Sequence, residues 1–503
     1  MHRSVFSLGL FPLLFFSYLA CGQGLRNADE FDIRVVAGGL SDPWEVTYGP
    51  DDFLWVTESK GYRVLRIDPA NGEKQVMLDL NALREFPRYD KLNDQVDGGK
   101  PWPQGGLMGM ALHPLLLEGK PFVYLVYVYR YKGAEDKGDG KMGAEGYQFL
   151  AKIVRYRYDA ATAKLTAPQT INDSIPASND HNGGRLLIAP LKGNFYLFYS
   201  TGDMGAGQFS NGGRTNHAQH ADSYEGKILR FNVEPDQSGA PWIPDDNPFN
   251  AKVESAVWSI GHRNPQGLAY ASIGGRDFLY STEHGPYSDD EVNLIEAGAN
   301  YGHPLVIGYA DGNYDGLAAS VSDKETLPGK WNTSYPLIGS EKNNARSLRA
   351  YRDPIYSFFP SPAKDLQALF EKVKNKQDAD WDAYAPSSIA VYQSAAIPGW
   401  NNSLLIPTLK GARLLRLKLN SEGRVADSTV YEYAKGKVRY RDVAISRDGK
   451  RIFLAVDSSS VTSGPSEENP SGISFRGSII ELKYKPKERQ DAAGAYARSP
   501  RRE

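Results

Sequence analysis

Cysteine is almost absent from this chain, since Cys21 is the single cysteine among 503 residues. One cysteine excludes an internal disulfide. A surplus of charge of either sign is also missing, because 58 Lys and Arg residues stand against 60 Asp and Glu residues, a formal net charge of -2. A near-neutral chain argues against a nucleic-acid-binding protein, whose electrostatic footprint is normally basic. The charge leaves small-molecule ligands open.

Long apolar runs are missing except near the start, where residues 5–19 form one short apolar stretch after Arg3. This stretch is typical of a secretory signal peptide over residues 1–20 and is too short for a permanent membrane span. Cys21 comes directly after "YLA", as in a bacterial lipoprotein signal, although Tyr18 stands where those signals usually have leucine. We therefore expect an exported protein, either periplasmic or anchored to the outer membrane by a lipid on Cys21. A plain secretory signal with an incidental cysteine is the alternative.

Aromatic residues and turn formers are abundant instead, with 30 Tyr, 50 Gly and 31 Pro. Aromatic strands interrupted by Gly and Pro are typical of an all-β protein. One pattern recurs six times: a polar start, a short apolar strand, a turn, and a second strand that ends in small or polar residues. The six copies begin at Asp42, Gln104, His181, Gly261, Ala385 and Tyr440. Further strand candidates follow most copies, so the pattern predicts a six-bladed β-propeller of four-stranded antiparallel blades. A large β-sandwich or two all-β domains is the alternative.

No internal linker divides the chain into separate domains. We expect an N-terminal linker over residues 21–31, one propeller domain over residues 32–486, and a disordered charged tail over residues 487–503. Three longer insertions interrupt the pattern, at residues 132–146, 203–223 and 308–380. The last insertion contains a short helical pattern that begins at Ala363.

Unusual polar residues fall at the same place in several copies, just before the first strand. They are Gln104, Asp180 with His181, His262 with Arg263 and Asn264, and Arg439 with Arg441. A second set, residues 283–286 and Lys410, falls where the second strand ends. Equivalent positions of successive propeller blades surround one central channel, so these residues would face each other. Four cations would then share one mouth with few carboxylates in register, which indicates an anionic ligand.

His181 is the candidate base of this constellation. A histidine titrates near neutral pH and can take a proton from an alcohol. We expect Asp180 to fix the tautomer of His181, and Arg263 to stabilise a developing oxyanion. These roles suit alcohol oxidation, yet protein side chains cannot accept a hydride, so a redox cofactor is needed. A turn histidine without chemistry is the alternative.

Other common site motifs are missing from the sequence. There is no P-loop, no Gly-x-Ser-x-Gly elbow, no His-Glu-x-x-His zinc site and no dinucleotide fingerprint. His217 and His220 stand three residues apart in a loop rich in Gly and Asn, which is a weak signal for a metal.

The chain resembles the quinoprotein glucose/sorbosone dehydrogenase family, which are soluble sugar dehydrogenases that use pyrroloquinoline quinone (PQQ). The resemblance covers roughly residues 40 to 485 in family order. It rests on "PQGGLMGMALHP", "DHNGGRL", "GHRNPQGLAY", "EHGPYSDDEVNLIEAGANYGHP", "APSSIAVY", "LIPTLKG" and "RYRDVAISRDG". It implies a six-bladed propeller that oxidises a small sugar and passes the electrons to an external acceptor.

The resemblance also implies roles for single residues. His181 matches the general base, Asp180 its neighbouring carboxylate, and Arg263 the arginine that contacts the quinone oxygens. The remaining expected PQQ contacts are Gln104, Asn264, Trp381, Lys410, Arg439 and Arg441. PQQ carboxylates would be the anion that the cations require.

Calcium is the second implied cofactor. The carbonyls of Gly285 and Pro286 match ligands of a calcium ion that bridges the protein and PQQ. A structural calcium is implied at Glu291, Tyr301, Ile307, Tyr309 and Asp311, with Glu325 as a further acidic candidate. The run "DGNYDG" is no EF-hand, because Ser322 stands where the final Glu should be, and an ordinary Asn/Asp/Gly turn is the alternative.

The chain departs from the family pattern at Met204, Asp378 and Ala383, which leaves the identity of the sugar open. Two other functions are weighed against the dehydrogenase. One is a binding or receptor propeller that has lost its chemistry, and the other is a calcium-dependent lactone hydrolase. We expect a monomer or a homodimer.

Overall fold

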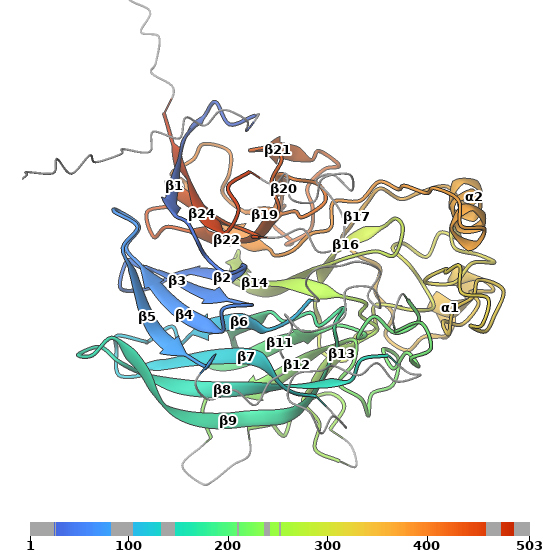
Figure 1. Cartoon of the computed structure of the whole chain (residues 1–503), viewed down its shortest axis with the longest axis horizontal. Coiled ribbons are helices and arrows are strands. Elements are labelled where there is room, and N and C mark those ends of the chain that lie inside the picture. Colours follow the sequence, from blue (N-terminus) through green and yellow to red (C-terminus); the bar gives the residue numbers. More distant parts are fainter. Residues whose placement is uncertain are drawn as a thin grey trace, which may run out of the picture.

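Six four-stranded antiparallel sheets, arranged as a six-bladed β-propeller, make up the fold of the computed structural model, as the recurring pattern predicts (Figure 1). The structure describes residues 25, 27–81, 104–131, 146–208, 211–235, 242–250, 253–458 and 474–486. The predicted signal peptide, Cys21 and the tail 487–503 lie outside these residues. No helix of the described chain is long and apolar enough to cross a membrane.

The strands follow one another blade by blade. The first and second blades comprise β2 (Pro43–Tyr48), β3 (Leu54–Glu58), β4 (Arg63–Ile67), β5 (Lys74–Asp79), β6 (Leu107–Leu112), β7 (Phe122–Tyr131), β8 (Phe149–Asp159) and β9 (Lys164–Ala177). The third and fourth comprise β10 (Leu186–Leu191), β11 (Asn194–Thr201), β12 (Lys227–Asn232), β13 (Val257–Ile260), β14 (Pro265–Ile273), β15 (Arg276–Glu283), β16 (Asp290–Leu294) and β17 (Tyr356–Phe358). The fifth comprises β18 (Ala390–Tyr392), β19 (Ser403–Pro407), β20 (Leu414–Lys418) and β21 (Tyr431–Tyr433). The sixth comprises β22 (Tyr440–Ile445), β23 (Arg451–Val456), β24 (Ser478–Tyr484) and β1 (Phe31–Ala37).

The first strands of the blades line the centre of the ring. β2, β6, β10, β14, β18 and β22 each contact the first strand of a neighbouring blade. Each begins shortly after, or at, one of the six predicted starts. The polar residues that precede these strands therefore gather at one mouth of the ring, as the sequence register predicts.

The sixth blade joins the two ends of the chain. β1 pairs antiparallel with β24, with Phe31 opposite Tyr484 and Val35 opposite Ile480. Arg34 on β1 also forms an ion pair with Glu481 on β24. Because β1, the first strand of the chain, completes the last blade, the ring closes through a backbone ladder. Closure of the ring limits the exposed sheet edges.

Apart from β17, which completes the fourth blade, the helices of the 308–380 segment lie beside the ring (Figure 1). The segment contains α2 (Ala363–Lys374), the helix predicted to begin at Ala363, and a short helix α1 (Glu341–Ser347) that the pattern does not predict. Its aromatic core includes Trp331 and Phe370, whose ring centroids lie 5.1 Å apart. The segment is a packed unit against the mouth of the propeller, and it contributes directly to the site.

Candidate active site

His181 lies in a turn with left-handed backbone conformations, in which two of the next three residues are glycines. Its own φ is 49°, and the next glycines, Gly183 and Gly184, have φ of 62° and 101°. A Cβ on Gly183 would lie 2.7 Å from the carbonyl oxygen of Ser200. A Cβ on Gly184 would lie 2.8 Å from the sulfur of Met108. The turn thus brings the imidazole to the mouth and leads at once into the inner strand β10.

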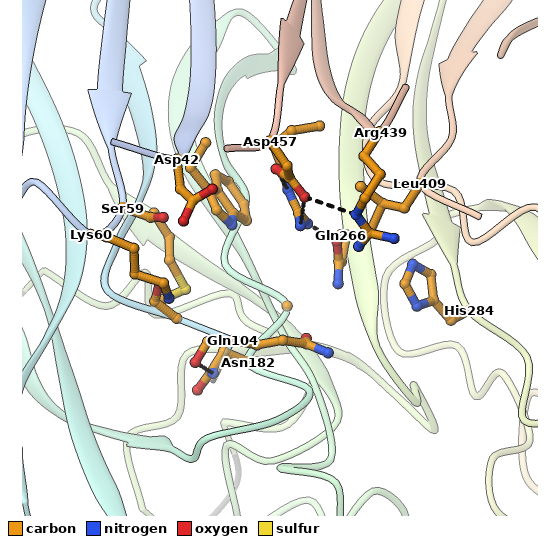
Figure 2. A pocket seen from close by; sticks show the side chains of 15 residues that line it. Asp42, Ser59, Lys60, Gln104, Asn182, Gln266, His284, Leu409, Arg439 and Asp457 are labelled. Atoms are coloured by element: carbon orange, nitrogen blue, oxygen red, sulfur yellow. Dashed lines mark hydrogen bonds and ion pairs between the residues drawn. The ribbon is translucent and has the colours of Figure 1, made fainter. Parts of the chain in front are cut away.

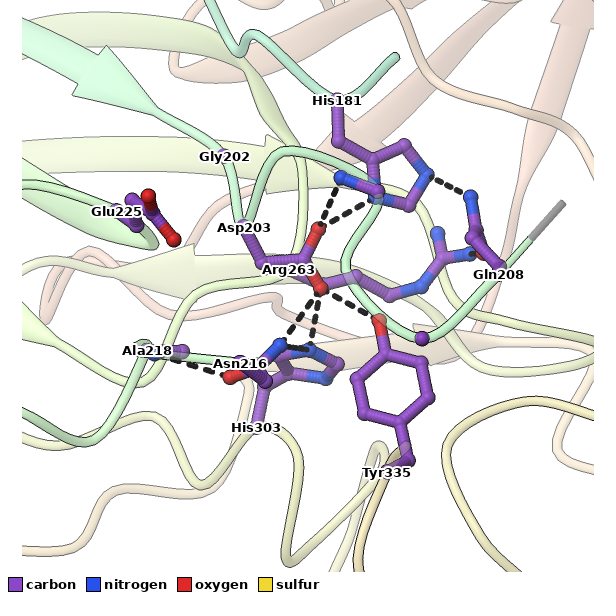
Figure 3. A network of polar contacts seen from close by, with 12 residues as sticks. His181, Gly202, Asp203, Gln208, Asn216, Ala218, Glu225, Arg263, His303 and Tyr335 are labelled. Atoms are coloured by element: carbon purple, nitrogen blue, oxygen red, sulfur yellow. Dashed lines mark hydrogen bonds and ion pairs between the residues drawn. The ribbon is translucent and has the colours of Figure 1, made fainter. Parts of the chain in front are cut away.

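The His181 imidazole is held at both nitrogens (Figure 3). Its Nδ1 lies 2.7 Å from Oδ1 of Asp203, and its Nε2 lies 2.8 Å from the amide nitrogen of Gln208. A carboxylate only accepts hydrogen bonds, so Nδ1 carries the proton. Nε2 therefore keeps a lone pair, which accepts from the Gln208 amide. This is the tautomer that a general base needs.

Asp203 is a buried carboxylate whose oxygens accept hydrogen bonds from neighbouring side chains and from the backbone of its own loop. Oδ1 also accepts from the Gly205 backbone at 3.0 Å. Oδ2 accepts from His303 Nε2 at 2.8 Å, from Tyr335 at 2.6 Å and from Asn216 at 3.0 Å. Burial alone would raise the pKa of Asp203, but the two histidines, which donate hydrogen bonds to it and attract it when protonated, hold it well below its ordinary value. Asp203 therefore stays ionised beside His181.

The expectation that Asp180 fixes the His181 tautomer is wrong. Its Oδ1 accepts from the His181 backbone N–H at 3.1 Å and from Gln104 Nε2 at 2.6 Å, while Oδ2 accepts from Gln208 Nε2 at 3.1 Å. The Asp180 carboxylate and the His181 ring both reach Nε2 of Gln208, but Asp180 meets this amide, the Gln104 amide and the backbone rather than Nδ1 of the ring. It orients Gln104 and Gln208 instead.

Arg263 reaches the same amide from the fourth blade. Its NH2 donates to Oε1 of Gln208 at 2.8 Å and its NH1 to the carbonyl of His284 at 3.2 Å. The carboxylate of Glu283 accepts from the Arg263 backbone N–H at 2.8 Å and fixes the start of β14. The structure thus brings His181, Arg263 and Gln104 together, as predicted, with Gln208 between them.

Two buried donors at this mouth have no hydrogen-bond partner within the described residues. They are Nε of Arg263 and Nδ2 of Asn264. Asn264 is fully buried, and its Oδ1 accepts from the Gly183 backbone at 3.2 Å. Buried donors without partners are costly, so a group rich in acceptor oxygens suits this place.

Gly183 and His284, which hydrogen-bond Asn264 and Arg263, line a polar pocket (Figure 2). Every blade except the fifth contributes polar residues to its lining, among them Lys60, Gln104, Asn182, Gln266, His284 and Arg439. Leu409 comes from the fifth blade. Burial lowers the pKa of Lys60 to about 8, with Arg441 adding to the effect and Asp42 opposing it. The pocket therefore combines several cations with apolar walls, which suits a planar polyanion.

The expectation that few carboxylates stand in register with these cations is wrong. Arg441 binds both oxygens of Asp457, at 3.0 and 2.8 Å, and Arg439 lies 3.5 Å from the same carboxylate. Burial lowers the pKa of Arg439 to about 10, although Asp457 opposes the shift. Asp457 follows β23 directly and presents both guanidinium groups to the pocket.

Lys410 and Trp381, two of the expected cofactor contacts, lie together. The ammonium group of Lys410 lies 4.7 Å from the Trp381 ring centroid and donates to the Trp381 carbonyl. It also pairs with Asp380 at 3.1 Å. Tyr287 packs edge-on against Trp381, with centroids 5.0 Å apart. Leu409, which precedes this lysine, lines the pocket.

The turn that holds Gly285 and Pro286 is unusually tight. A Cβ on Gly285 would lie 1.7 Å from the carbonyl oxygen of Ser288. The Gly285 N–H donates to Asp290 at 3.0 Å, and the other oxygen of Asp290 accepts from the Tyr384 backbone at 2.7 Å. Asp290 thus joins this turn to the start of the fifth blade and packs backbone carbonyls closely at Gly285.

The second predicted calcium set surrounds the loop 301–315. Glu291 accepts from the Gly308 backbone at 2.9 Å, and Asp311 accepts from the Asn313 backbone at 3.0 Å. The Tyr301 hydroxyl donates to the carbonyl of Leu294 at 2.6 Å. The expected ligands of this set are Glu291, Tyr301, Ile307, Tyr309 and Asp311.

Glu341 lies against this loop and was not found from the sequence. It accepts from the Ile307 backbone at 2.9 Å and from Gly312 at 3.0 Å, whereas Glu325 is exposed. Among the described residues, no three His, Cys, Asp or Glu side chains gather in a way that could hold a metal ion. Any calcium here would need backbone and amide oxygens as well as carboxylates.

Sequence reasoning missed Asp203, Gln208, His303 and Tyr335. One signal was available for the first of them, because a carboxylate stands at or just after the end of the second strand in four blades. These carboxylates are Glu58, Asp203, Glu283 and Asp457.

The family model described as "Glucose / Sorbosone dehydrogenase" matches residues 40–340 and 372–462. Quinoprotein glucose dehydrogenase B of Acinetobacter calcoaceticus is 31% identical over 493 residues, covering 92% of each chain. Aldose sugar dehydrogenase YliI of Escherichia coli is 28% identical over 433 residues, covering 85% of this chain and 91% of that protein. The PQQ-bound form of aldose sugar dehydrogenase from Streptomyces coelicolor has the same fold, with a TM-score of 0.58 at 24% identity, covering 91% of this chain and 100% of that one.

The propeller, its polar mouth and these matches define an oxidoreductase that acts on the CH–OH groups of sugars. The chain belongs to the glucose/sorbosone dehydrogenase family, as the resemblance predicts.

Proposed function

We propose that this protein is a PQQ- and calcium-dependent aldose sugar dehydrogenase that works outside the cytoplasm. The state of His181 carries the proposal: Asp203 binds its Nδ1–H, and the lone pair on Nε2 lies at a polar mouth beside Arg263. Its similarity to quinoprotein glucose dehydrogenase B supports PQQ as the cofactor.

The residues at the mouth fit such a cofactor. The unpartnered donors of Arg263 and Asn264 would meet quinone oxygens, and Lys60, Arg439 and Arg441 would hold carboxylates. Gln104, Lys410 and Trp381 complete the expected contacts. When bound, PQQ supplies the hydride acceptor that no side chain can provide.

His181 acts on the sugar through its free lone pair. The hydroxyl proton of the sugar passes to Nε2 while Nδ1–H stays hydrogen-bonded to Asp203. The negative charge of Asp203 stabilises the imidazolium that forms. The Gln208 amide, now on Nε2, must give way to the sugar hydroxyl and is placed to bind a neighbouring sugar oxygen. Asp180 keeps that amide in reach.

Calcium would be held by oxygen ligands at two places. The crowded carbonyls around Gly285 and Pro286 suit the cofactor-side ion. The loop around Glu291 and Asp311 suits a structural ion, since the buried amide oxygens of Asn293 and Asn313 have no partner within the described residues.

The site does not name the sugar. Met204, beside Asp203, is fully buried, and Asp378 is exposed. We propose that the substrate is an aldose and that the electrons pass to an external acceptor. We further propose that the protein is exported and is either periplasmic or anchored to the outer membrane by a lipid on Cys21.

The test adds PQQ and calcium to the purified protein and follows the quinone absorbance, then dye reduction with a panel of aldoses. We expect binding at micromolar PQQ and sugar-dependent reduction that His181→Ala abolishes while PQQ still binds. Binding without reduction by any aldose would favour a receptor. Lactone hydrolysis that needs calcium but not PQQ would favour the hydrolase. Wild-type turnover in His181→Ala would overturn the role of His181 as the base.

A further inference from the structure

Tyr335 comes from the 308–380 segment and reaches the catalytic pair of the third blade (Figure 3). Its hydroxyl donates to Oδ2 of Asp203 at 2.6 Å, and its side chain is buried. Burial and the charge of Asp203 raise the pKa of Tyr335 well above its ordinary value, so the hydroxyl keeps its proton and remains a donor.

The same stretch holds the turn that carries Asp203 and Gln208. The Thr333 hydroxyl donates to the carbonyl of Gly207 at 2.5 Å, and the Thr333 side chain also accepts from the Tyr335 backbone at 3.2 Å. The Tyr335 ring lies directly on Gly207, where a Cβ would come within 2.4 Å of it. The segment therefore contacts both the backbone of the turn and the carboxylate that it presents.

The electrostatic surroundings of His181 give this contact a consequence. The groups that face the imidazole or its partners are Asp203, Asp180, Arg263, His284, His303 and Tyr335. Of the described residues, Asp203 alone binds the ring through a full negative charge, and Tyr335 shares that carboxylate. A donor on Oδ2 stabilises the carboxylate charge and weakens its pull on the proton at Nδ1.

We propose that Tyr335 is a positioning residue for His181: its bond to Asp203 lowers the proton affinity of the imidazole, and its ring holds the 203–208 turn so that Gln208 meets Nε2. A weaker base is ionised less at neutral pH and stays ready to take a proton from sugar. The inference rests on the proposed role of His181 as the base.

Tyr335→Phe tests the proposal, because it keeps the ring on Gly207 and removes only the hydroxyl. Tyr351→Phe is the matched control: it removes a tyrosine-to-carboxylate bond in the same segment, to Asp353 at 2.9 Å. In the PQQ- and calcium-loaded enzyme, we expect the acidic limb of the pH profile of kcat/KM to move up by about 0.5 to 1 pH unit in Tyr335→Phe. The limb should not move in Tyr351→Phe.

A second measurement needs no cofactor. In protein labelled with 15N-histidine, NMR titration of the His181 ring, assigned with His181→Gln, should show its pKa raised by the same amount in Tyr335→Phe alone. An unchanged His181 pKa in Tyr335→Phe would overturn the inference. If His181→Ala still turns over sugar, the proposed role of His181 as the base fails instead, and the NMR titration still decides whether Tyr335 acts on the imidazole.

Discussion

Nδ1 of His181 lies 2.7 Å from Oδ1 of Asp203, although 22 residues separate them in the chain. One residue stands in the turn before the inner strand of the third blade, and the other follows the second strand of that blade. The hairpin between them brings its two ends to the same mouth. The pair fixes the imidazole tautomer, and the first prediction depends on it.

Asp203→Asn replaces the carboxylate with an amide whose NH₂ group can donate to Nδ1. That bond favours the tautomer with its proton on Nε2, which cannot act as the base. We expect sugar turnover to fall by about 10²- to 10⁴-fold, the usual contribution of a general base, while PQQ still binds. Steady-state dye reduction and cofactor absorbance measure the two effects.

Asp180→Asn is the control for that change, because Asp180 meets the backbone and two amides but not the His181 ring. Its loss of turnover should be clearly smaller, and 15N NMR should find Nδ1–H retained. Equal losses in the two variants would contradict the assignment of the tautomer to Asp203.

Affinity for PQQ should fall as pH rises through about 8. Burial lowers the pKa of Lys60 to about 8, so its amine is charged below that pH and increasingly neutral above it. An anionic cofactor favours the charged amine, hence binding is strongest on the acidic side of this pKa. Cofactor titration between about pH 7 and 9.5 measures the slope.

Lys60→Met should weaken PQQ binding at neutral pH and remove most of that slope. Lys330→Met is the control, since Lys330 is exposed and lies over Trp331 away from the pocket. A slope that survives Lys60→Met would assign the titration to another group.

Gly207→Ala should impair turnover because the new methyl group would displace the Tyr335 ring. Gly316→Ala is its control: the two glycines have φ of 85° and 82°, yet nothing lies within 4 Å of a Cβ on Gly316. Both changes should cost stability of about 1 kcal/mol through the left-handed backbone. Only Gly207→Ala should also lower kcat/KM, as steady-state kinetics would measure, and similar kinetics in the two variants would contradict the contact.

Phe31→Ala should destabilise the whole ring. Phe31 is buried on β1 and packs against Trp400, with ring centroids 5.6 Å apart. Removing a buried phenylalanine costs about 3–5 kcal/mol, which urea unfolding would measure. Val35→Ala, at an exposed position of the same strand, should cost much less. Equal costs would mean that the seam of the ring does not depend on this side chain.

The fold was predictable because its pattern repeats. Each copy places a polar start before an inner strand, so Gln104, His181 and Arg263 could be assigned to one mouth from register alone. The same reasoning failed for Asp180, because register places a residue at the mouth but does not show which group its side chain meets, and Nδ1 of His181 is bound by Asp203 instead. It failed for Tyr335 because the 308–380 segment carries no repeat, and only tertiary packing brings this residue to Asp203.

The seam between β1 and β24 has a consequence for biosynthesis. Arg34 and Glu481, which pair across it, stand 447 residues apart, so the ribosome makes β1, the outer strand of the last blade, long before the strand β24 with which it pairs. The ring cannot close until β24 has been made, and so late a contact makes folding slow. Until then the chain has no completed propeller.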